Sequence, residues 1–291
     1  MNPAAAGGKL RQLLPAALGR LRSAGLEVEV RETAARGHAS DIARQAWSEG
    51  YRKFISAGGD GTSFEIVNGL FPLAGPEPPT LGFLPLGTGN SFLRDFSDKG
   101  VEYAIESLVR RRSRVCDVLR LGHKQGALYY INLLSMGFTA DVAALRLRRF
   151  PAWGELGYQA SIFICLARFR RRSFPVAVDG EDKMDRRPCL FLTFNNSKFT
   201  GGTMMIAPQA STDDGLIEYV RWGPIGRVGL IRNLPGLYNG KHIEHRQAEV
   251  HKVRRVDFHL GEAVDVMVDG EVFTLECESL DVLAGALRVV A

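Results

Sequence analysis

Two glycine-rich turns constrain the fold of this 291-residue chain more than any other feature of its sequence. The first turn, 58–62 (GGDGT), follows the strand-like run 53–57. The second, 87–90 (GTGN), follows the strand-like run 81–84, and a helix-like stretch comes after each turn. Strands and helices that alternate in this way predict a parallel, doubly wound sheet. Because open α/β sheets bind ligands beyond the carboxyl ends of their strands, we expect both turns at one ligand-binding edge.

The residue types in the first turn favour a phosphate site. Glycine lets the backbone approach an anion closely, and the N-terminus of the following helix offers free N–H groups. Asp60 would repel phosphate unless it helps to hold a divalent cation, which phosphoryl transfer requires. A tight left-handed turn capped by Asp60 is the structural alternative. Neither turn matches GxxxxGK[ST] or GxGxxG, which disfavours a P-loop enzyme and a dinucleotide-binding Rossmann site.

The rest of the chain divides into two parts that differ in predicted secondary structure. In the first part, apolar spacing predicts helices at 10–21, 40–49 and 62–70, and a strand at 26–30. In the second part, only 145–170 and 226–239 have helical spacing. Short strands separated by Gly, Pro and Asp are expected there at 118–121, 127–133, 175–178, 189–194, 216–220, 253–260, 263–268 and 272–275.

The fold class that follows is α/β plus β. We expect an N-terminal α/β nucleotide-binding domain, 1–117, and a β-sandwich-like domain, 118–291, with the active site in the cleft between them. The last residues are expected to return to the N-terminal domain.

Composition narrows the class of protein only broadly. The formal net charge of +5 suits anionic partners such as nucleotides, acidic lipids or nucleic acid. The four cysteines form no CxxC pair, which favours buried thiols in a reducing compartment. No apolar run is long enough to cross a bilayer. We therefore expect a cytoplasmic protein that lies at most on the inner face of a membrane.

Five further motifs accompany the two turns. In chain order they are Asn2-Pro3 with Gly7-Gly8-Lys9, Thr33 with Gly37-His38-Ala39, Gly201-Gly202 with Ala207-Pro208, Asp214-Gly215-Leu216, and Asp269-Gly270-Glu271. Together with GGDGT and PLGTGN, this series resembles the diacylglycerol kinase-like catalytic domain of bacterial lipid kinases, sphingosine kinases and ceramide kinases, a relative of NAD kinase. The resemblance covers nearly the whole chain. It implies an ATP- and Mg²⁺-dependent kinase that phosphorylates a hydroxyl group of diacylglycerol or a related lipid.

The resemblance also assigns roles to residues. ATP would be contacted by Thr33, Gly58, Gly59, Asp60, Gly61, Thr62, Ser63, Phe64, Gly87, Thr88, Gly89 and Asn90. Asp60 would in addition help to hold the catalytic Mg²⁺. Glu271 would be the general base, a role that suits a carboxylate because a lipid hydroxyl must lose its proton as it attacks phosphorus. The alternative for Glu271 is a hairpin-turn residue, since Asp-Gly is a strong hairpin signal.

A second, structural Mg²⁺ is implied by the same resemblance. Its ligands would be the Asp214 carboxylate and backbone carbonyls near Ser211 and Leu216. Oxygen ligands with few charges suit Mg²⁺, which keeps several waters. The alternative is that this segment is an ordinary loop turn.

The sequence departs from the family pattern in three places. Phe64 stands where the family usually has Asn, and Ser91 stands where it usually has Asp. In some bacterial members that Asp joins a charged network, of which Asp117 would be the other acidic member here. The family also has a strand before the Asn2-Pro3 turn that this sequence does not contain, and we expect the natural start to lie upstream.

One segment of the second part has the composition of a lipid-binding surface. Arginines at 146–149 and 168–172 flank an apolar, aromatic stretch, which suits docking on anionic lipid, whereas a core helix with solvated ends is the alternative. We expect a lipid substrate at a membrane surface and no nucleic-acid partner. Two other functions remain open: a NAD kinase-like enzyme that acts on a soluble acceptor, and a non-catalytic nucleotide- or lipid-binding protein.

Overall fold

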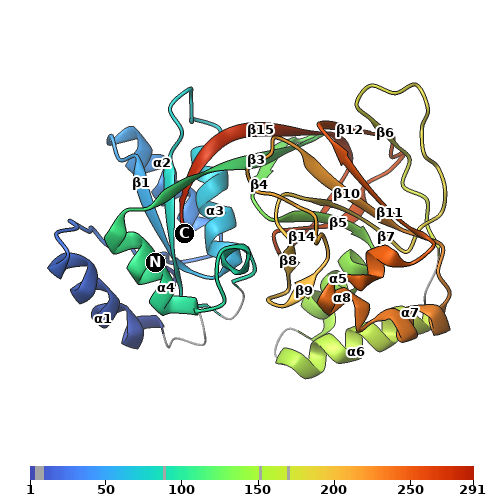
Figure 1. The fold of residues 1–291 in the computed structure, drawn as a ribbon, viewed down its shortest axis with the longest axis horizontal. Helices are drawn as coiled ribbons and strands as arrows, with labels where there is room; N and C mark the ends of the chain where they lie inside the picture. Colours follow the sequence, from blue (N-terminus) through green and yellow to red (C-terminus); the bar gives the residue numbers. More distant parts are fainter. Residues whose placement is uncertain (4–9, 88–89, 151–152, 169–170) are drawn as a thin grey trace. The chain divides into compact units, whose positions relative to one another are not determined.

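The computed structural model describes residues 1–3, 10–87, 90–150, 153–168 and 171–291, which form two compact units (Figure 1). The first unit comprises Met1–Val118, Thr212–Asp214 and Leu283–Ala291, and the second comprises Leu119–Ser211 and Gly215–Val282. Two long strands, β3 (Ser113–His123) and β15 (Cys277–Val290), run through both units.

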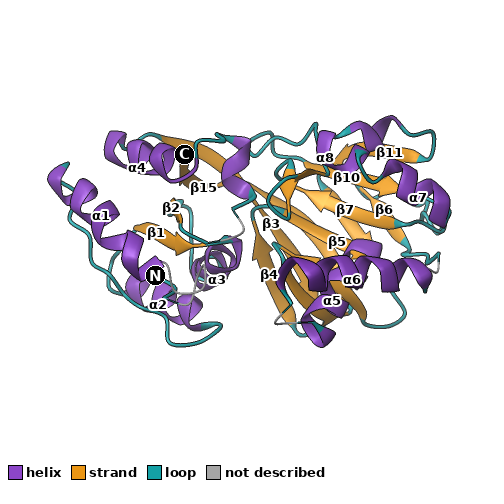
Figure 2. Cartoon of the chain, turned by 90° about the horizontal axis from the view of Figure 1, so that it is seen from below, coloured by secondary structure: helices purple, strands orange, loops and turns teal. Residues whose placement is uncertain are grey.

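The first unit is a parallel sheet covered by helices on both faces. Its strands β1 (Lys53–Gly58) and β2 (Thr80–Pro85) pair in parallel, and the end of β15 pairs in parallel with β2. Figure 2 shows α4 on one side of β1 and β2 and α3 on the other. The helices are α1 (Leu10–Ser23), α2 (His38–Ser48), α3 (Asp60–Leu70), α4 (Gly100–Arg110) and the 3-10 helix η2 (Phe92–Asp95). This is the predicted doubly wound α/β arrangement.

The second unit is built mainly from antiparallel strands. One sheet has the order β11-β10-β7-β5-β13-β14, and β12 pairs with both β6 and β15. The strands are β4 (Gly126–Tyr130), β5 (Leu133–Gly137), β6 (Val176–Val178), β7 (Phe191–Asn195), β8 (Phe199–Thr200), β9 (Met204–Met205), β10 (Ile217–Trp222), β11 (Ala248–Val253), β12 (Arg255–Phe258), β13 (Val264–Val268) and β14 (Glu271–Leu275). This confirms the predicted β-sandwich-like domain.

The helices of the second unit pack against the sheet β11-β10-β7-β5-β13-β14. They are α5 (Phe138–Arg149), α6 (Gly154–Ala167), α7 (Arg227–Asn233), α8 (Gly236–Asn239) and the 3-10 helix η3 (Lys241–Glu244). Trp222 and Phe191, which are fully buried, centre the core that these helices share with β7 and β10. Among the described residues, no helix is long and apolar enough to span a bilayer.

Four expectations about elements were wrong. Residues 26–30 form no strand; they are extended but pair with no described strand. The helix expected at 145–170 is two helices, α5 and α6, and Pro151 in the sequence between them explains the break. The helix expected at 226–239 is likewise divided, with Pro235 at the N-cap of α8. The single strand expected at 253–260 is the end of β11 followed by β12.

Candidate functional site

The two glycine-rich turns lie against each other at the carboxyl ends of β1 and β2. The Gly87 N–H donates a hydrogen bond to the Gly58 carbonyl over 3.0 Å. A Cβ atom on Gly87 would lie only 2.7 Å from both Cα and N of Gly59, and one on Gly58 would overlap the Thr62 hydroxyl. Close approach of backbone to backbone therefore requires glycine at 87, and at 58 a side chain would meet that of Thr62.

The first turn is not the tight left-handed turn that we named as an alternative. Gly58, Gly59 and Gly61 all lack a positive φ, and Asp60 is already the first residue of α3. Gly59 is extended at the helix N-cap, and its carbonyl accepts the Thr62 N–H over 3.0 Å. The N-terminal N–H groups of α3 thus follow directly from β1, which is a favourable arrangement for an anion such as phosphate.

Asp60 links the two turns. Its carboxylate Oδ2 accepts the Ser91 backbone N–H over 3.0 Å, at the start of η2. Burial raises the pKa of the Asp60 carboxyl, and hydrogen bonds from Ser91 and Phe92 lower that pKa in part. A buried carboxylate beside a turn whose geometry suits a phosphate fits a Mg²⁺ ligand, because a cation would stabilise the charge that burial destabilises.

Side chains on the first turn of α3 contribute to packing. Ser63 donates a hydrogen bond to the Ser56 hydroxyl over 2.9 Å and so ties α3 to β1. The Phe64 ring is only 6% exposed, which places it in the core and leaves its backbone as the part that could reach a nucleotide. Asn90 donates to the Gly87 carbonyl over 2.9 Å and shapes the second turn. Thr88 and Gly89, like Gly7, Gly8 and Lys9, lie outside the described residues.

Thr33 is held near the first turn by backbone contacts. Its N–H donates to the Met1 carbonyl over 2.9 Å, while the Asn2 N–H donates to Ala57, one residue before the turn. Glu65 then fixes the segment that follows Thr33: its two carboxylate oxygens accept the N–H groups of Gly37 and Ala39 over 2.7 and 3.1 Å. We did not single out Glu65 from the sequence, although its place one turn after Thr62 was a usable signal.

The proposed structural Mg²⁺ ligands lie in the loop before β10. Asp214 is exposed and precedes Gly215, which has a φ of +67°. The loop is anchored by the Thr212 carbonyl, which accepts the Asp117 N–H over 2.7 Å. An exposed carboxylate in a bent loop with backbone carbonyls nearby at Ser211 and Leu216 fits the oxygen donor set of Mg²⁺. No group of three or more His, Cys, Asp or Glu side chains forms a metal cluster among the described residues.

Glu271 stands at the start of β14, directly after a two-residue hairpin turn. Val268 pairs with Glu271 across the turn, and Asp269 and Gly270 have φ values of +47° and +87°. Two positive φ angles are typical of a type I′ hairpin turn. The hairpin reading is therefore correct for the turn itself, and Glu271 can still serve as a base because it follows the turn on a paired strand.

Asp269 fastens this hairpin to the segment 131–133 of the same unit. Its carboxylate accepts the backbone N–H groups of Ile131, Asn132 and Leu133 over 3.1, 3.0 and 2.9 Å, and the side chain is 4% exposed. Its own N–H donates to Leu133. The position of Glu271, two residues later, therefore depends on a buried network that sequence reasoning assigned no role.

A cavity of about 430 Å³ lies between α5, α6 and β13 in the second unit. Phe138 and Ile164 give it apolar walls, whereas Arg148, Arg168 and Arg172 bring positive charge. Arg172 forms an ion pair with Asp141, and burial raises the pKa of the Asp141 carboxyl. Arg148 pairs likewise with Asp265, so the polar part of the lining carries both signs of charge. Such a cavity could hold a molecule with an apolar body and a polar head.

Asn195 and Asn196, which precede the Gly201-Gly202 motif, are buried in the second unit. Asn195 donates to the Glu218 carbonyl over 2.8 Å and Asn196 to the Ile131 carbonyl over 2.9 Å. The Asn196 side chain thus supports the segment that Asp269 binds, whereas the Asn195 side chain ties β7 to β10.

These features define a phosphotransferase of the kind that joins an α/β nucleotide-binding unit to a β-sandwich-like unit. Residues 1–121 match the diacylglycerol kinase catalytic domain, and residues 132–291 match the YegS C-terminal NAD kinase beta sandwich-like domain. The chain belongs to the diacylglycerol kinase-like family of lipid kinases.

Individual relatives agree with this assignment. A protein named probable lipid kinase YegS-like from Chromohalobacter salexigens is 33% identical, with 98% of this chain and 91% of that protein covered. The diacylglycerol kinase of Bacillus subtilis is 28% identical over 93% of this chain and 88% of its own length. Among solved structures, a diacylglycerol kinase from Bacillus anthracis superposes with a TM-score of 0.71 at 19% identity, covering 99% and 94% of the two chains. An NAD kinase from Archaeoglobus fulgidus in complex with ATP has the same fold at a TM-score of 0.52 and 14% identity, covering 100% and 91%.

Proposed function

We propose that this protein transfers the γ-phosphate of ATP to a hydroxyl group of diacylglycerol or a related membrane lipid. The observation that carries the proposal is the pair of packed glycine turns at the carboxyl ends of β1 and β2, where Gly87 donates to Gly58. Backbone N–H groups and a helix N-terminus suit a polyphosphate. The family assignment and the ATP complex of the related NAD kinase support ATP as the donor.

Each residue has a defined task in this proposal. The turn 58–62 and Gly87 bind and orient the phosphates, and Thr33 contacts the nucleotide from the neighbouring segment. Asp60 positions Mg²⁺, which when bound supplies charge neutralisation between the phosphates. Because phosphoryl transfer relies on positioning and electrostatic stabilisation, rigid turns of this kind are what the reaction needs. Asp214, with the carbonyls of Ser211 and Leu216, would hold the second Mg²⁺ as a structural ion.

Glu271 accepts the proton of the lipid hydroxyl as the hydroxyl oxygen attacks the γ-phosphorus. The bond to the bridging oxygen of ADP breaks as the new P–O bond forms. Asp269 orients Glu271 through the clamp on residues 131–133. The cavity between α5, α6 and β13 is the proposed place for part of the lipid, since β13 and β14 form the hairpin that bears Glu271.

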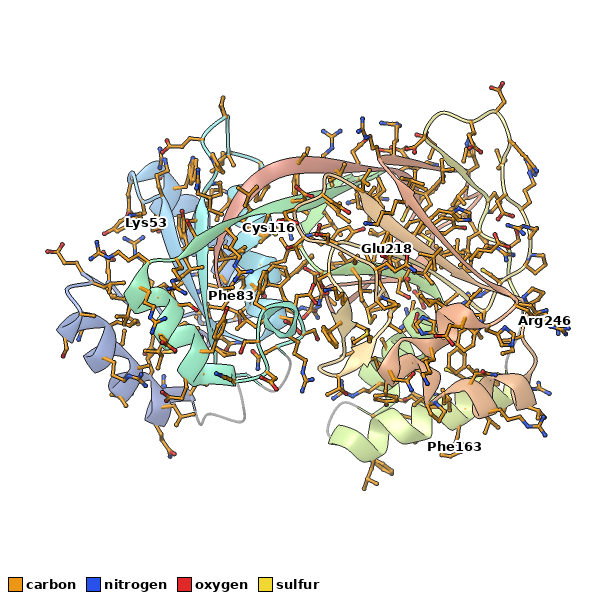
Figure 3. All side chains as sticks on the ribbon, in the orientation of Figure 1. Lys53, Phe83, Cys116, Phe163, Glu218 and Arg246 are labelled. Atoms are coloured by element: carbon orange, nitrogen blue, oxygen red, sulfur yellow. The ribbon has the colours of Figure 1, made fainter. Side chains whose placement is uncertain are left out.

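A membrane surface is the proposed partner of α6 and α7. Large apolar side chains are exposed on both helices, including Leu156 (74%), Phe163 (68%) and Val228 (63%). Figure 3 shows Phe163 projecting outward from α6. Arg227 donates to two carbonyls at the end of α6, which brings the two helices together. Exposed apolar side chains beside arginines suit the interface of an anionic bilayer.

Vesicle sedimentation tests the membrane partner. Binding to vesicles with anionic lipid should exceed binding to zwitterionic vesicles, and the double variant Leu156→Asp, Phe163→Asp should lose it. Leu73→Asp changes an exposed leucine of the first unit and serves as the matched control. Equal binding by the double variant and the control would remove α6 from this role.

The function itself is tested by transfer of label from γ-labelled ATP to a panel of lipids in mixed micelles with Mg²⁺. We expect label on one lipid class, a loss of at least about a hundredfold in Glu271→Gln, and no loss in Glu262→Gln, an exposed carboxylate in the loop before β13. Phosphorylation of NAD without any lipid would instead indicate a NAD kinase-like enzyme. ATP binding without turnover on any acceptor would indicate a binding protein.

A further inference from the structure

The densest run of arginines in the first unit links α4 to β3. Residues 109–115 read Val-Arg-Arg-Arg-Ser-Arg-Val, and all seven are exposed. Val109 and Val115, at the two ends of the run, have exposed fractions of 37% and 48%. Residues 109–115, which we call the basic segment, therefore present both positive charge and apolar side chains to solvent.

The backbone of the basic segment is fixed by the end of α4. Arg111 has a φ of +52°, and its N–H donates a hydrogen bond to the Leu108 carbonyl over 3.1 Å. The Arg112 N–H donates to the Ser107 carbonyl over 3.3 Å. These two bonds form the Schellman motif, in which glycine is the usual residue at the positive φ. An arginine at this position strains the backbone relative to glycine, so its charge is present at some loss of stability.

Three of the four arginines have no carboxylate partner in the described part of the chain. Arg110 forms an ion pair with a glutamate one turn earlier on α4. Arg111 donates over 3.2 Å to a backbone carbonyl of the turn after α1. Arg114 lies 5.6 Å from the centroid of an aromatic ring, that of Phe96. Arg111, Arg112 and Arg114 thus form no ion pair with any described residue, and their charges are not neutralised within the first unit.

The fold explains only part of this charge. Arginines at the C-terminal end of a helix stabilise the helix dipole, which accounts for Arg110 and Arg111. Arg112 lies beyond α4, and Arg114 belongs to β3. The first three residues of β3 are all exposed, so Arg114 and Val115 contribute to no core. Simple solvation is the structural alternative for these residues.

We propose that the basic segment docks the first unit on the surface of a bilayer that contains anionic lipid. The negative surface potential of such a bilayer attracts clusters of about four to eight Lys and Arg. Guanidinium groups match headgroup phosphates in geometry as well as in charge. Val109 and Val115 would enter the boundary between headgroups and acyl chains on either side of the arginines.

The exposed valines favour a bilayer over a nucleic acid as the partner. Nucleic-acid binding would engage the same arginines, because phosphate contacts come from charged and polar groups. In a bilayer, apolar side chains beside the cations add to binding as well. The proposal extends the membrane partner proposed for α6 and α7 to a second element in the other unit, and it rests on that part of the proposed function but not on the reaction.

Vesicle sedimentation of the full chain tests the docking. Each arginine near an anionic surface strengthens binding about fivefold, so Arg112→Gln, Arg114→Gln should weaken it about 25-fold. The matched control, Arg11→Gln, Arg44→Gln, removes two exposed arginines of the same unit, each paired with a carboxylate. Because both variants lose the same charge, we expect the control to bind at least about five times more tightly, with the difference lost at about 1 M salt. Equal binding by the two variants would overturn the proposal.

Arg111→Gly separates charge from helix capping. Glycine suits the positive φ at this position, so we expect the urea midpoint to be maintained or raised while vesicle binding weakens about fivefold. A lower urea midpoint with unchanged vesicle binding would assign Arg111 to the helix alone and contradict the proposal. Loss of single-stranded oligonucleotide binding in Arg112→Gln, Arg114→Gln, with vesicle binding intact, would assign the basic segment to nucleic acid instead. Phosphorylation of lipid in neutral detergent micelles should be equal in all these variants, so its absence in the natural protein would refute the proposed reaction and leave the docking result standing.

Discussion

The clamp formed by Asp269 allows a quantitative prediction. Its buried carboxylate accepts three backbone N–H groups, from Ile131, Asn132 and Leu133. Asp269→Ala leaves these donors unpaired in a buried loop and places Ala at a positive φ of +47°. An unsatisfied buried donor costs about 1–3 kcal/mol, so we expect a loss of about 3–5 kcal/mol in the free energy of unfolding of the second unit after partial relaxation.

Asp269→Asn separates the hydrogen bonds from the backbone strain. Oδ1 accepts two of the bonds and Oδ2 one, so the amide keeps two acceptor contacts and turns its NH₂ group toward the third donor. Asn also tolerates the left-handed conformation. We therefore expect a smaller loss, about 1–2 kcal/mol. Because Glu271 follows on the same hairpin, both variants should lower kcat. The affinity for ATP should stay unchanged, since the residues proposed to bind ATP lie in the first unit.

Urea unfolding followed by circular dichroism, together with calorimetric titration of ATP, checks both statements. Glu262→Gln is a suitable control, since Glu262 is an exposed carboxylate in the loop that leads into the same hairpin. If Ala and Asn at position 269 each cost less than about 1 kcal/mol, the three hydrogen bonds do not hold the hairpin and our account of Glu271 is refuted.

Three further predictions concern the first unit and the pH dependence of the second. Glu65→Gln should weaken ATP binding about tenfold in calorimetry, because one of the N–H groups of Gly37 and Ala39 loses its carboxylate acceptor and the segment after Thr33 loosens. Gly87→Ala should abolish ATP binding, since its Cβ would lie 2.7 Å from Gly59 backbone atoms, whereas Gly75→Ala, with no atom within 4 Å of its Cβ, should bind normally. Burial lowers the pKa of His242, so the unfolded state binds more protons below about pH 6.5 and stability should fall as pH drops from there toward the folded-state pKa; His242→Gln should flatten this part of the urea-midpoint profile.

The sequence predicted strands and turns well where several neighbouring residues indicate the same element. The runs before the two glycine turns are short and mostly apolar, and a glycine-rich turn follows each, so β1 and β2 were predicted within one residue at each end. The hairpin at Asp269–Gly270 followed from the same turn chemistry. The parallel sheet followed from the alternation of strands with helices.

Long-range pairing explains what the sequence did not reveal. β15 was not predicted, because its apolar residues do not alternate along its length; it is a strand because Arg288–Val290 pair with β2 and Arg255–Asp257 pair with its earlier part. Residues 26–30 alternate like a strand, yet they pair with no described strand and instead line a cavity. The contacts of Glu65 and Asp269 join positions 26 to 138 residues apart, which no local pattern encodes.

Ser91, which stands where the family usually has Asp, allows the effect of one departure from the family pattern to be predicted. The residue is 1% exposed, and both its backbone N–H and its side chain hydrogen-bond to Asp60, whose pKa burial has already raised. Ser91→Asp would place a second carboxylate at hydrogen-bond distance from the first. Two carboxylates at such a distance cannot both ionise cheaply, so we expect the variant to lose about 2–3 kcal/mol of unfolding free energy at pH 7.

The pH dependence of this loss identifies its cause. A carboxyl whose pKa is raised by folding binds more protons in the folded state, so its destabilisation grows as pH rises and declines as pH falls toward the raised pKa. Ser91→Asp should therefore recover much of its stability between pH 7 and pH 5. Ser91→Asn has nearly the same shape without the charge, and its stability relative to the natural protein should not change over that range. If the two variants are equally unstable at both pH values, the effect of residue 91 is one of shape, and the charge of Asp60 is balanced by groups other than Ser91.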